Sequence, residues 1–300
     1  MDARGRRLII IGASVMVSFS SIFFRLSDSP SMVMTFYRML FASAIIVPLA
    51  LWRCREELFS LGGRDLLMSV LSGIVFAVHI AAFFESLNHV SIASCLVLTD
   101  TAVFFVALFM MLFFKESVSR KGWGIMALTF GGCVLIAVSD MSGEMGLVGD
   151  LLALVSSVLF AVYAMVGRRV RGRVSTLCYT SVLYVSAAVT SLIIVLASGD
   201  SGYMFSDTDD ILLGIGLAVC CTIFGHTVYN WGLRYEKAAF VAITTLLEPV
   251  FGSVLGLIIF NEVPGILVVL GSVVVLLGVY LFSLDTAPDP QSYAESEDLR

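Results

Sequence analysis

Charged residues are scarce in this chain, and their scarcity excludes an ordinary water-soluble fold. Asp, Glu, Lys and Arg make up 14% of the 300 residues, whereas hydrophobic residues make up 59%. A soluble domain of this size could not cover so much apolar surface with so few polar side chains. We therefore expect most of the chain to lie within a lipid bilayer.

The chain also lacks the motifs of nucleotide-driven pumps and of common membrane enzymes. It contains no GxxxxGKS or GxxxxGKT phosphate-binding loop, no HExxH and no GxSxG. Its six cysteines show no metal-ligand spacing. Its basic residues are spread over several short loops and form no patch that could read a nucleic acid. We expect no cofactor, no metal site and no nucleic-acid partner.

Long apolar segments, separated by short polar loops, fill most of the sequence. Each is close to the roughly 20 residues that an α-helix needs to cross the hydrocarbon of a bilayer. The ten segments are 8–24, 31–52, 66–87, 91–114, 122–139, 147–167, 175–197, 211–233, 238–260 and 264–283. The sequence thus predicts an all-α, polytopic membrane protein with ten transmembrane helices.

The distribution of positive charge predicts how these helices are threaded. All of the 18 Lys and Arg residues except Arg25 and Arg38 fall before the first segment, in every second loop or at the C-terminus. The other loops contain Arg25 and several acidic residues. By the positive-inside rule, both termini are cytoplasmic. We expect a multi-pass protein of the plasma membrane.

The two halves of the chain match each other weakly when the second is slid back onto the first. The matched pairs include Ala93 and Ala239, Thr99 and Thr245, Glu116 and Glu262, and, with one further residue of shift, His79 and His226. Because each half has five segments, the second half enters the membrane from the opposite side. Such inverted repeats are common in secondary transporters. We expect five-helix repeats over 1–141 and 142–284, and a disordered cytoplasmic tail over 285–300.

Motifs at the ends of the fourth and ninth segments carry a family resemblance. Phe-Lys-Glu116 closes the fourth, Phe-Asn-Glu262 closes the ninth, and a glycine-punctuated segment follows each. With Thr244-Thr-Leu-Leu-Glu-Pro-Val-Phe-Gly252, these residues resemble the EamA-type branch of the drug/metabolite transporter superfamily over about residues 8–283. The first half departs from the pattern, with Val103 where the second has Pro249. The resemblance implies a small-metabolite permease, often an exporter, with substrate sites in a central cavity between the halves.

Ionisable residues inside the apolar segments are candidates for the substrate site. A charge at a helix centre costs about 2.5–3.5 kcal/mol on insertion scales, so it needs a partner, a cavity or a proton. Arg38 and Asp100 lie at similar depths, roughly 10 and 13 Å from the outer edge, and we expect an ion pair between them. This pair would either hold Arg38 ready for a substrate carboxylate or phosphate, or lock helices two and four together.

Glu248 lies near the middle of the ninth segment, beside Pro249. Proline removes a backbone hydrogen bond and frees a carbonyl that can face a cavity. Thr245 lies one turn earlier on the same side. Glu248 would bind a substrate amine or change its protonation during transport, which makes it the coupling candidate. The alternative is a neutral carboxyl that bridges helices.

The eighth segment carries one polar stripe in an otherwise apolar helix. Thr222, His226 and Asn230 follow at i, i+4 and i+8, with Tyr229 beside them. Together with His79, the repeat mate of His226, these side chains would line the cavity. The alternative for each histidine is a hydrogen-bonded contact between helices.

We expect a secondary transporter, in the export direction, for a small metabolite such as an amino acid, working by alternating access around a midplane cavity. The alternative is an integral-membrane enzyme that acts on a lipid or isoprenoid. Its one acidic motif, Asp207-Thr-Asp-Asp210, has no second acid motif facing it. The GxxxG stripe Gly252–Gly256 is compatible with packing between the halves or with a homodimer. Glu116 and Glu262 are expected to cap the helices that follow them.

Overall fold

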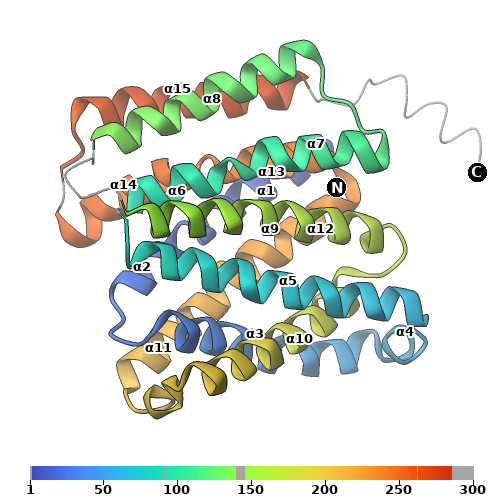
Figure 1. Ribbon diagram of the computed structural model, residues 1–300. Coiled ribbons are helices and arrows are strands. Elements are labelled where there is room, and N and C mark those ends of the chain that lie inside the picture. Colours follow the sequence, from blue (N-terminus) through green and yellow to red (C-terminus); the bar gives the residue numbers. More distant parts are fainter. Residues whose placement is uncertain (1, 91, 140–145, 262, 286–300) are drawn as a thin grey trace, which may run out of the picture.

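The computed structural model describes residues 2–90, 92–139, 146–261 and 263–285, and all regular structure in these ranges is helical (Figure 1). The predicted all-α class is therefore confirmed. Within the described ranges, nine helical stretches are long and apolar enough to cross a membrane. They are Ala3–Arg25, Ser31–Arg53, Gly63–Leu87, Ser94–Phe114, Leu147–Arg171, Thr176–Ser198, Thr208–Tyr235, Ala238–Ile259 and Ile266–Asp285.

Several of these stretches consist of more than one helix. In chain order the helices are α1 (Ala3–Val17), α2 (Phe19–Arg25), α3 (Ser31–Arg53), α4 (Arg55–Phe59), α5 (Gly63–Leu87), α6 (Ile92–Asp100), α7 (Ala102–Phe114), α8 (Arg120–Ser139), α9 (Leu147–Arg171), α10 (Thr176–Ser198), the 3-10 helix η1 (Asp200–Tyr203), α11 (Thr208–Gly216), the π-helix η2 (Leu217–His226), α12 (Thr227–Tyr235), α13 (Ala238–Thr245), α14 (Glu248–Phe260) and α15 (Ile266–Asp285).

The remaining predicted segment, 122–139, corresponds to α8, which lies along α15 at the top of the view in Figure 1. Glycines let the two backbones approach closely. A Cβ atom at Gly132 would lie 2.8 Å from the carbonyl oxygen of Gly271, and one at Gly278 would lie 2.0 Å from the Thr129 hydroxyl. Helix packing thus explains Gly132, Gly271 and Gly278, whereas a Cβ atom at Gly124 or Gly131 would meet no atom within 4 Å.

The ninth span is broken in its middle, beside a proline. α13 ends at Thr245 and α14 begins at Glu248, with two leucines between them. Pro249 has no N–H group, so the carbonyl of Thr245 loses the donor that a continuous helix would supply. The N–H groups of the two leucines bond instead to the carbonyls three residues back, both at 3.2 Å.

The fourth span is broken at the matching position without a proline. α6 ends at Asp100 and α7 begins at Ala102. The Thr101 hydroxyl donates to the carbonyl of Leu98 at 2.6 Å, and the Thr101 N–H bonds to the same carbonyl at 3.3 Å. A threonine hydroxyl that competes for a main-chain acceptor in this way favours a departure from the helix. The two spans therefore bend alike although only one contains the proline.

The two broken spans also end alike. Lys115 follows α7 with a φ of 58°, and Asn261 follows α14 with a φ of 56°. Both residues hold the left-handed conformation that commonly terminates a helix. Glu262, the boundary predicted between 141 and 142, and the tail after Asp285 lie outside the described residues, and the predictions for them stay predictions.

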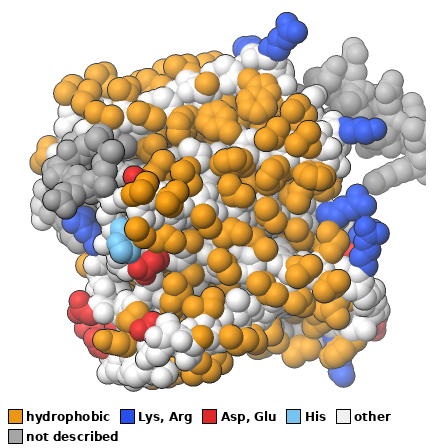
Figure 2. Space-filling model, in the orientation of Figure 1, with side chains coloured by type: hydrophobic (Ala, Val, Ile, Leu, Met, Phe, Trp, Pro, Cys, Tyr) orange, Lys and Arg blue, Asp and Glu red, His pale blue; other side chains and the backbone are white. Residues whose placement is uncertain are grey.

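The surface is apolar across its middle and polar at its ends. Figure 2 shows a face covered by hydrophobic side chains, with Lys and Arg mostly toward its right-hand end and acidic side chains standing out toward its left-hand end. Large aliphatic side chains such as Ile193, Leu212 and Ile258 are exposed. Exposed apolar surface on this scale suits contact with lipid.

Candidate substrate site

A cavity lies at the level of the two helix breaks. The empty space, including the part open to the surroundings, is ≈ 460 Å³. The residues that line it are Val17, Ser20, Arg38, His79, Ile80, Phe83, Leu96, Thr99, Asp100, Ala102, Phe160, His226, Thr245 and Glu248. Eight of these 14 residues are polar or charged, and the other six are apolar.

Arg38, on α3, is completely buried. Its Nε donates to the hydroxyl of Thr222 and its Nη1 to the hydroxyl of Ser20, both at 2.9 Å. Nη2 is buried without a hydrogen-bond partner. The two hydroxyls hold the guanidinium in one orientation and leave one nitrogen free to bind an anion.

The predicted ion pair between Arg38 and Asp100 is wrong. Among the described residues, no carboxylate forms an ion pair with Arg38. Matching depths do not ensure contact, because side chains on two helices meet only where the helices turn the same faces toward each other. Arg38 points toward hydroxyls on α2 and η2, and its charge is left for another partner.

Asp100 ends α6 and is 4% exposed, and its Oδ2 atom has no hydrogen-bond partner. The hydroxyl oxygen of the preceding residue, Thr99, is also buried and unpartnered. A buried polar group without a partner costs about 1–3 kcal/mol, and more if it is charged. Two such oxygens belong to residues that line one cavity.

Glu248 and Thr245 contribute to the same cavity from the broken ninth span. Glu248 is the first residue of α14, where the helix dipole favours a negative charge. The Thr245 hydroxyl donates to the carbonyl of Ala242 at 2.8 Å. The side chains of Asp100 and Glu248 thus reach the cavity from helix breaks in the two halves of the chain.

The two histidines of the cavity lie with their ring centres 6.4 Å apart. The Nδ1 atom of His79 is 2.9 Å from the carbonyl oxygen of Ser156. Nδ1 also lies 2.8 Å from the Ser156 hydroxyl, which can donate or accept, so these contacts are compatible with either tautomer of His79. Nδ1 of His226 has no partner, and its ring packs edge-on against Phe76 at 4.7 Å. The pair therefore offers polar ring atoms within an aromatic wall.

Three of the residues predicted from the sequence do not line the cavity. The Thr222 hydroxyl accepts a hydrogen bond from Nε of Arg38. Tyr229 donates to the hydroxyl of Ser14 at 2.9 Å, and Asn230 donates to the hydroxyl of Tyr163. Of the polar stripe on the eighth span, only His226 reaches the cavity, and the other members hold helices together.

Sequence reasoning missed eight residues of the cavity wall, of which four are polar or aromatic: Ser20, Thr99, Phe83 and Phe160. Thr99 carried a signal, since it is the repeat mate of Thr245. Ser20 belongs to a serine-rich run, with Ser18 and Ser21, in which no pattern distinguishes it. The two phenylalanines carried no signal, because nothing in the sequence distinguishes them from the other phenylalanines of apolar helices.

A second group of charged residues closes the positively charged end of the molecule. Glu236 pairs with Arg6 at 3.3 Å and with Arg7 at 3.0 Å. Glu116 pairs with Arg168 on α9 at 2.6 Å. These pairs join the N-terminus to the loop after α12, and the loop after α7 to α9.

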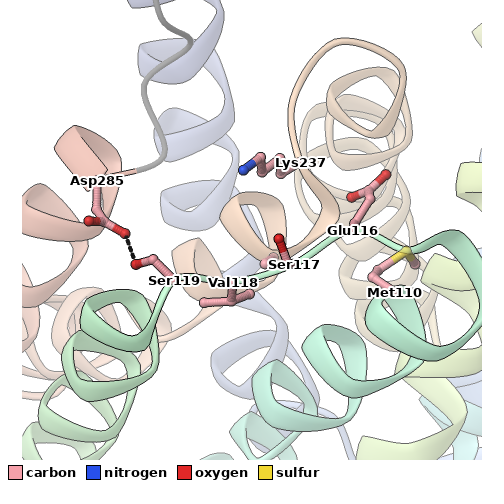
Figure 3. Close-up of a pocket in the computed structure, with 8 residues that line it drawn as sticks. Met110, Glu116, Ser117, Val118, Ser119, Lys237 and Asp285 are labelled. Atoms are coloured by element: carbon pink, nitrogen blue, oxygen red, sulfur yellow. Dashed lines mark hydrogen bonds between the residues drawn. The ribbon is translucent and has the colours of Figure 1, made fainter.

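Glu116 was predicted to cap α8, and this prediction is wrong. The N–H of Gly122, in the first turn of α8, is bound instead by the Ser119 hydroxyl at 2.8 Å. Figure 3 shows a small pocket in this region, with Glu116 on one side and Asp285 bonded to Ser119 at 2.6 Å on the other. Lys237 stands between the two sides in the same view.

Together, the apolar spans and the polar cavity at their centre have the architecture of a polytopic membrane transporter. The sequence profile of the EamA-like transporter family matches residues 7–138 and 147–284. The chain belongs to this family. The resemblance drawn from the sequence is thereby confirmed, as is the expectation of a multi-pass membrane protein.

Individual relatives are distant. An uncharacterized transporter of Archaeoglobus fulgidus is 25% identical over 251 residues, which cover 83% of this chain and 86% of that protein. The pseudopaline exporter CntI of Pseudomonas aeruginosa is 26% identical over 238 residues, covering 79% and 82%. The human solute carrier family 35 member G1 is 26% identical over 253 residues, covering 80% and 68%. A crystal structure with 15% sequence identity shares the fold, with a TM-score of 0.79 over 95% of this chain and 98% of its own.

Proposed function

We propose that this protein is a secondary transporter that exports a small metabolite such as an amino acid, by alternating access around the cavity. The observation that carries this proposal is the pair of unpartnered atoms, Nη2 of Arg38 and Oδ2 of Asp100, that belong to one buried cavity. A solute with a carboxylate and an ammonium group could satisfy both. Membership of a transporter family favours this function over an enzyme of lipid or isoprenoid substrates.

The direction of transport is proposed as outward. One relative is named as an exporter of pseudopaline, a small metabolite, which supports export. The chain contains no nucleotide-binding motif, so a solute or ion gradient is the proposed source of energy.

We further propose two inverted five-helix repeats, 1–141 and 142–284, with α8 as the tenth span. The helix packing supports a two-fold relation between them. The contact of α5 with α9 has its counterpart in the contact of η2 with α1. The contact of α10 with α5 has its counterpart in the contact of η2 with α3. The last spans of the two halves, α8 and α15, pack on each other. The matched breaks and matched left-handed caps support the same relation. The concentration of basic residues at one end supports cytoplasmic termini in the plasma membrane.

The structure is closed at its positively charged end by the ion pairs of Glu236 and Glu116. None of these residues lines the cavity. Release of substrate toward the opposite side, followed by breakage of these pairs, would give the two states that alternating access requires. Glu248, at the break of the ninth span, is the proposed coupling residue.

Ligand binding and flux by the full-length protein test the proposal. A panel of amino acids and related amines and carboxylates is screened by thermal shift of the detergent-purified protein, because a ligand of the folded state raises its melting temperature. Ligands that stabilise it are then tested for counterflow in proteoliposomes. Arg38→Gln should lose the stabilisation by carboxylates, whereas Arg53→Gln, at an exposed position outside the cavity, should retain it. Retention of carboxylate binding and flux in Arg38→Gln would contradict the proposal.

A homodimer stays a prediction. A Cβ atom at Gly252, in the GxxxG stripe, would meet no atom within 4 Å, so this part of α14 is open for lipid or for a second copy. Light scattering of the purified protein on size-exclusion chromatography distinguishes the monomer from the dimer.

A further inference from the structure

The cavity contains more negative than positive charge. Arg38 is the only cationic side chain of its described wall, whereas Asp100 and Glu248 are both acidic. With both carboxyl groups ionised and both histidines neutral, the sum is one negative charge. Because an uncompensated charge away from water is unfavourable, one additional positive charge would stabilise this ionised state.

A zwitterionic substrate cannot supply this charge. Its carboxylate and ammonium groups cancel, so the sum in the cavity is the same with and without it. The compensating charge must come from a proton, from an inorganic cation or from a solute that is itself a net cation.

The oxygen atoms around Asp100 suit an inorganic cation. Oδ2 of Asp100 is buried and has no hydrogen-bond partner. The Thr99 hydroxyl oxygen is unpartnered as well, and the Thr245 carbonyl lacks a helical donor because residue 249 is proline. Hydroxyl and carbonyl oxygens beside carboxylates are the ligands of hard cations.

The helix ends point to the same ligand. α6 ends at Asp100 and α13 ends at Thr245, and both residues line the cavity. The C-terminal end of a helix carries partial negative charge, and interrupted membrane helices use such ends to bind sodium ions or protons. Among the described residues, no group of three or more His, Cys, Asp or Glu side chains could hold a metal ion, so hydroxyl and carbonyl oxygens would have to complete the coordination of a cation here.

We propose that Asp100, Glu248, Thr99 and Thr245 form a site for one sodium ion, between the breaks of the fourth and ninth spans. The inference rests on the proposed function, because the ion would serve as the coupling ion of the transporter. A substrate ammonium would need the same carboxylate oxygens, so sodium and substrate exclude each other. Mutual exclusion is the condition for exchange, in which sodium enters as the metabolite leaves. An exchange that keeps the cavity neutral in both steps requires a substrate of net charge +1.

Equilibrium binding of radioactive sodium to the purified full-length protein tests the site, with choline chloride keeping the ionic strength constant. The wild type should bind sodium saturably, and unlabelled sodium but not choline should displace it. Asp100→Asn and Glu248→Gln should each weaken binding by about tenfold or more, as the loss of a metal-site partner typically does. Glu56→Gln, which changes an exposed carboxylate outside the cavity, should bind as the wild type does.

Thr99→Val separates sodium from a proton. This variant removes an oxygen ligand and leaves every charge in place, so sodium binding should weaken, whereas a protonated carboxyl would be unaffected. Thr99→Val also tests the site if Asp100→Asn and Glu248→Gln do not fold. Absence of saturable sodium binding, or unchanged affinity in both Thr99→Val and Asp100→Asn, would overturn the site, as would proton uptake by wild type in place of sodium binding.

The outcome is separable from that of the proposed function. Substrate binding that depends on Arg38 is measured in sodium-free choline buffer, where the sodium site plays no part. If substrates bind and are transported while sodium does not bind, the proposed transport function is supported and the sodium site is refuted. If sodium binds and none of the panel is transported, the ion site stands and the proposed substrate class fails.

Discussion

Replacing Glu236 with glutamine should open the positively charged end of the protein. The Glu236 side chain is 2% exposed and pairs with two arginines of the N-terminal helix, at 3.3 and 3.0 Å. Removing one partner of a buried ion pair costs about 3–5 kcal/mol. Because these pairs join elements that must separate when this end opens, the cost falls on the closed state. At about 1.4 kcal/mol per factor of ten, the equilibrium should move toward the open state by roughly 100-fold or more.

The assay is the rate at which a cysteine behind the network reacts with a membrane-impermeant maleimide. Met110 is 1% exposed and lines the pocket beside Glu116 (Figure 3). Met110→Cys, in a background without the native cysteines, reports whether water reaches this position. In inside-out vesicles, Glu236→Gln should accelerate its alkylation at least about tenfold, a conservative bound on the shift in the equilibrium.

Arg173→Gln is the matched control. It breaks the ion pair of Arg173 with Asp65 at the same end of the molecule, but the Arg173 side chain is 51% exposed. Exposed pairs contribute about 0–1 kcal/mol, so the alkylation rate should stay within a few-fold of wild type. Equal rates in the two variants would refute the view that the buried pairs hold this end closed.

Three further predictions concern packing, orientation and reactivity. Gly278→Ala should lower the stability by about 1–3 kcal/mol, seen as a lower melting temperature, because the new methyl group overlaps a side chain of α8. Gly252→Ala should leave the melting temperature unchanged, because its methyl group meets no atom within 4 Å. Thr222→Val should weaken carboxylate binding in the thermal-shift screen by roughly tenfold, since it leaves a buried guanidinium donor unpaired; Thr190→Val, whose hydroxyl bonds only within its own helix, should have no effect. Burial raises the pKa of the Cys54 thiol, which lies outside the spans. The mid-point of the pH dependence of its alkylation rate should therefore lie at a higher pH than that of a free thiol. A mid-point at the pH of free cysteine would contradict this last prediction.

Composition and charge pattern were enough to predict the class of protein. Long apolar stretches leave few alternatives to membrane-spanning helices, since a bilayer tolerates no unpaired backbone. Arg38, Asp100 and Glu248 could be singled out for the same reason, because a charge in an apolar helix is costly wherever it points. All three line the cavity.

The partners of these residues could not be predicted in the same way. Arg38 and Asp100 lie at similar depths, yet the guanidinium binds the hydroxyls of Thr222 and Ser20. Depth follows from the rise per residue along one helix, but contact depends on how helices are rotated against one another. The residues of the polar stripe on the eighth span therefore have different surroundings. Asn230 bonds to Tyr163, and of the stripe only His226 lines the cavity.

By itself, the sequence determined the membrane-spanning helices, the polarity of their ends and the family, because these depend on the solvent that each segment can tolerate. Tertiary structure decided which buried charges share a cavity, which hydroxyls hold them and where the fourth span breaks without a proline. Those features depend on the rotation and close approach of helices that are far apart in the chain, and such geometry is set by the packing of the whole bundle.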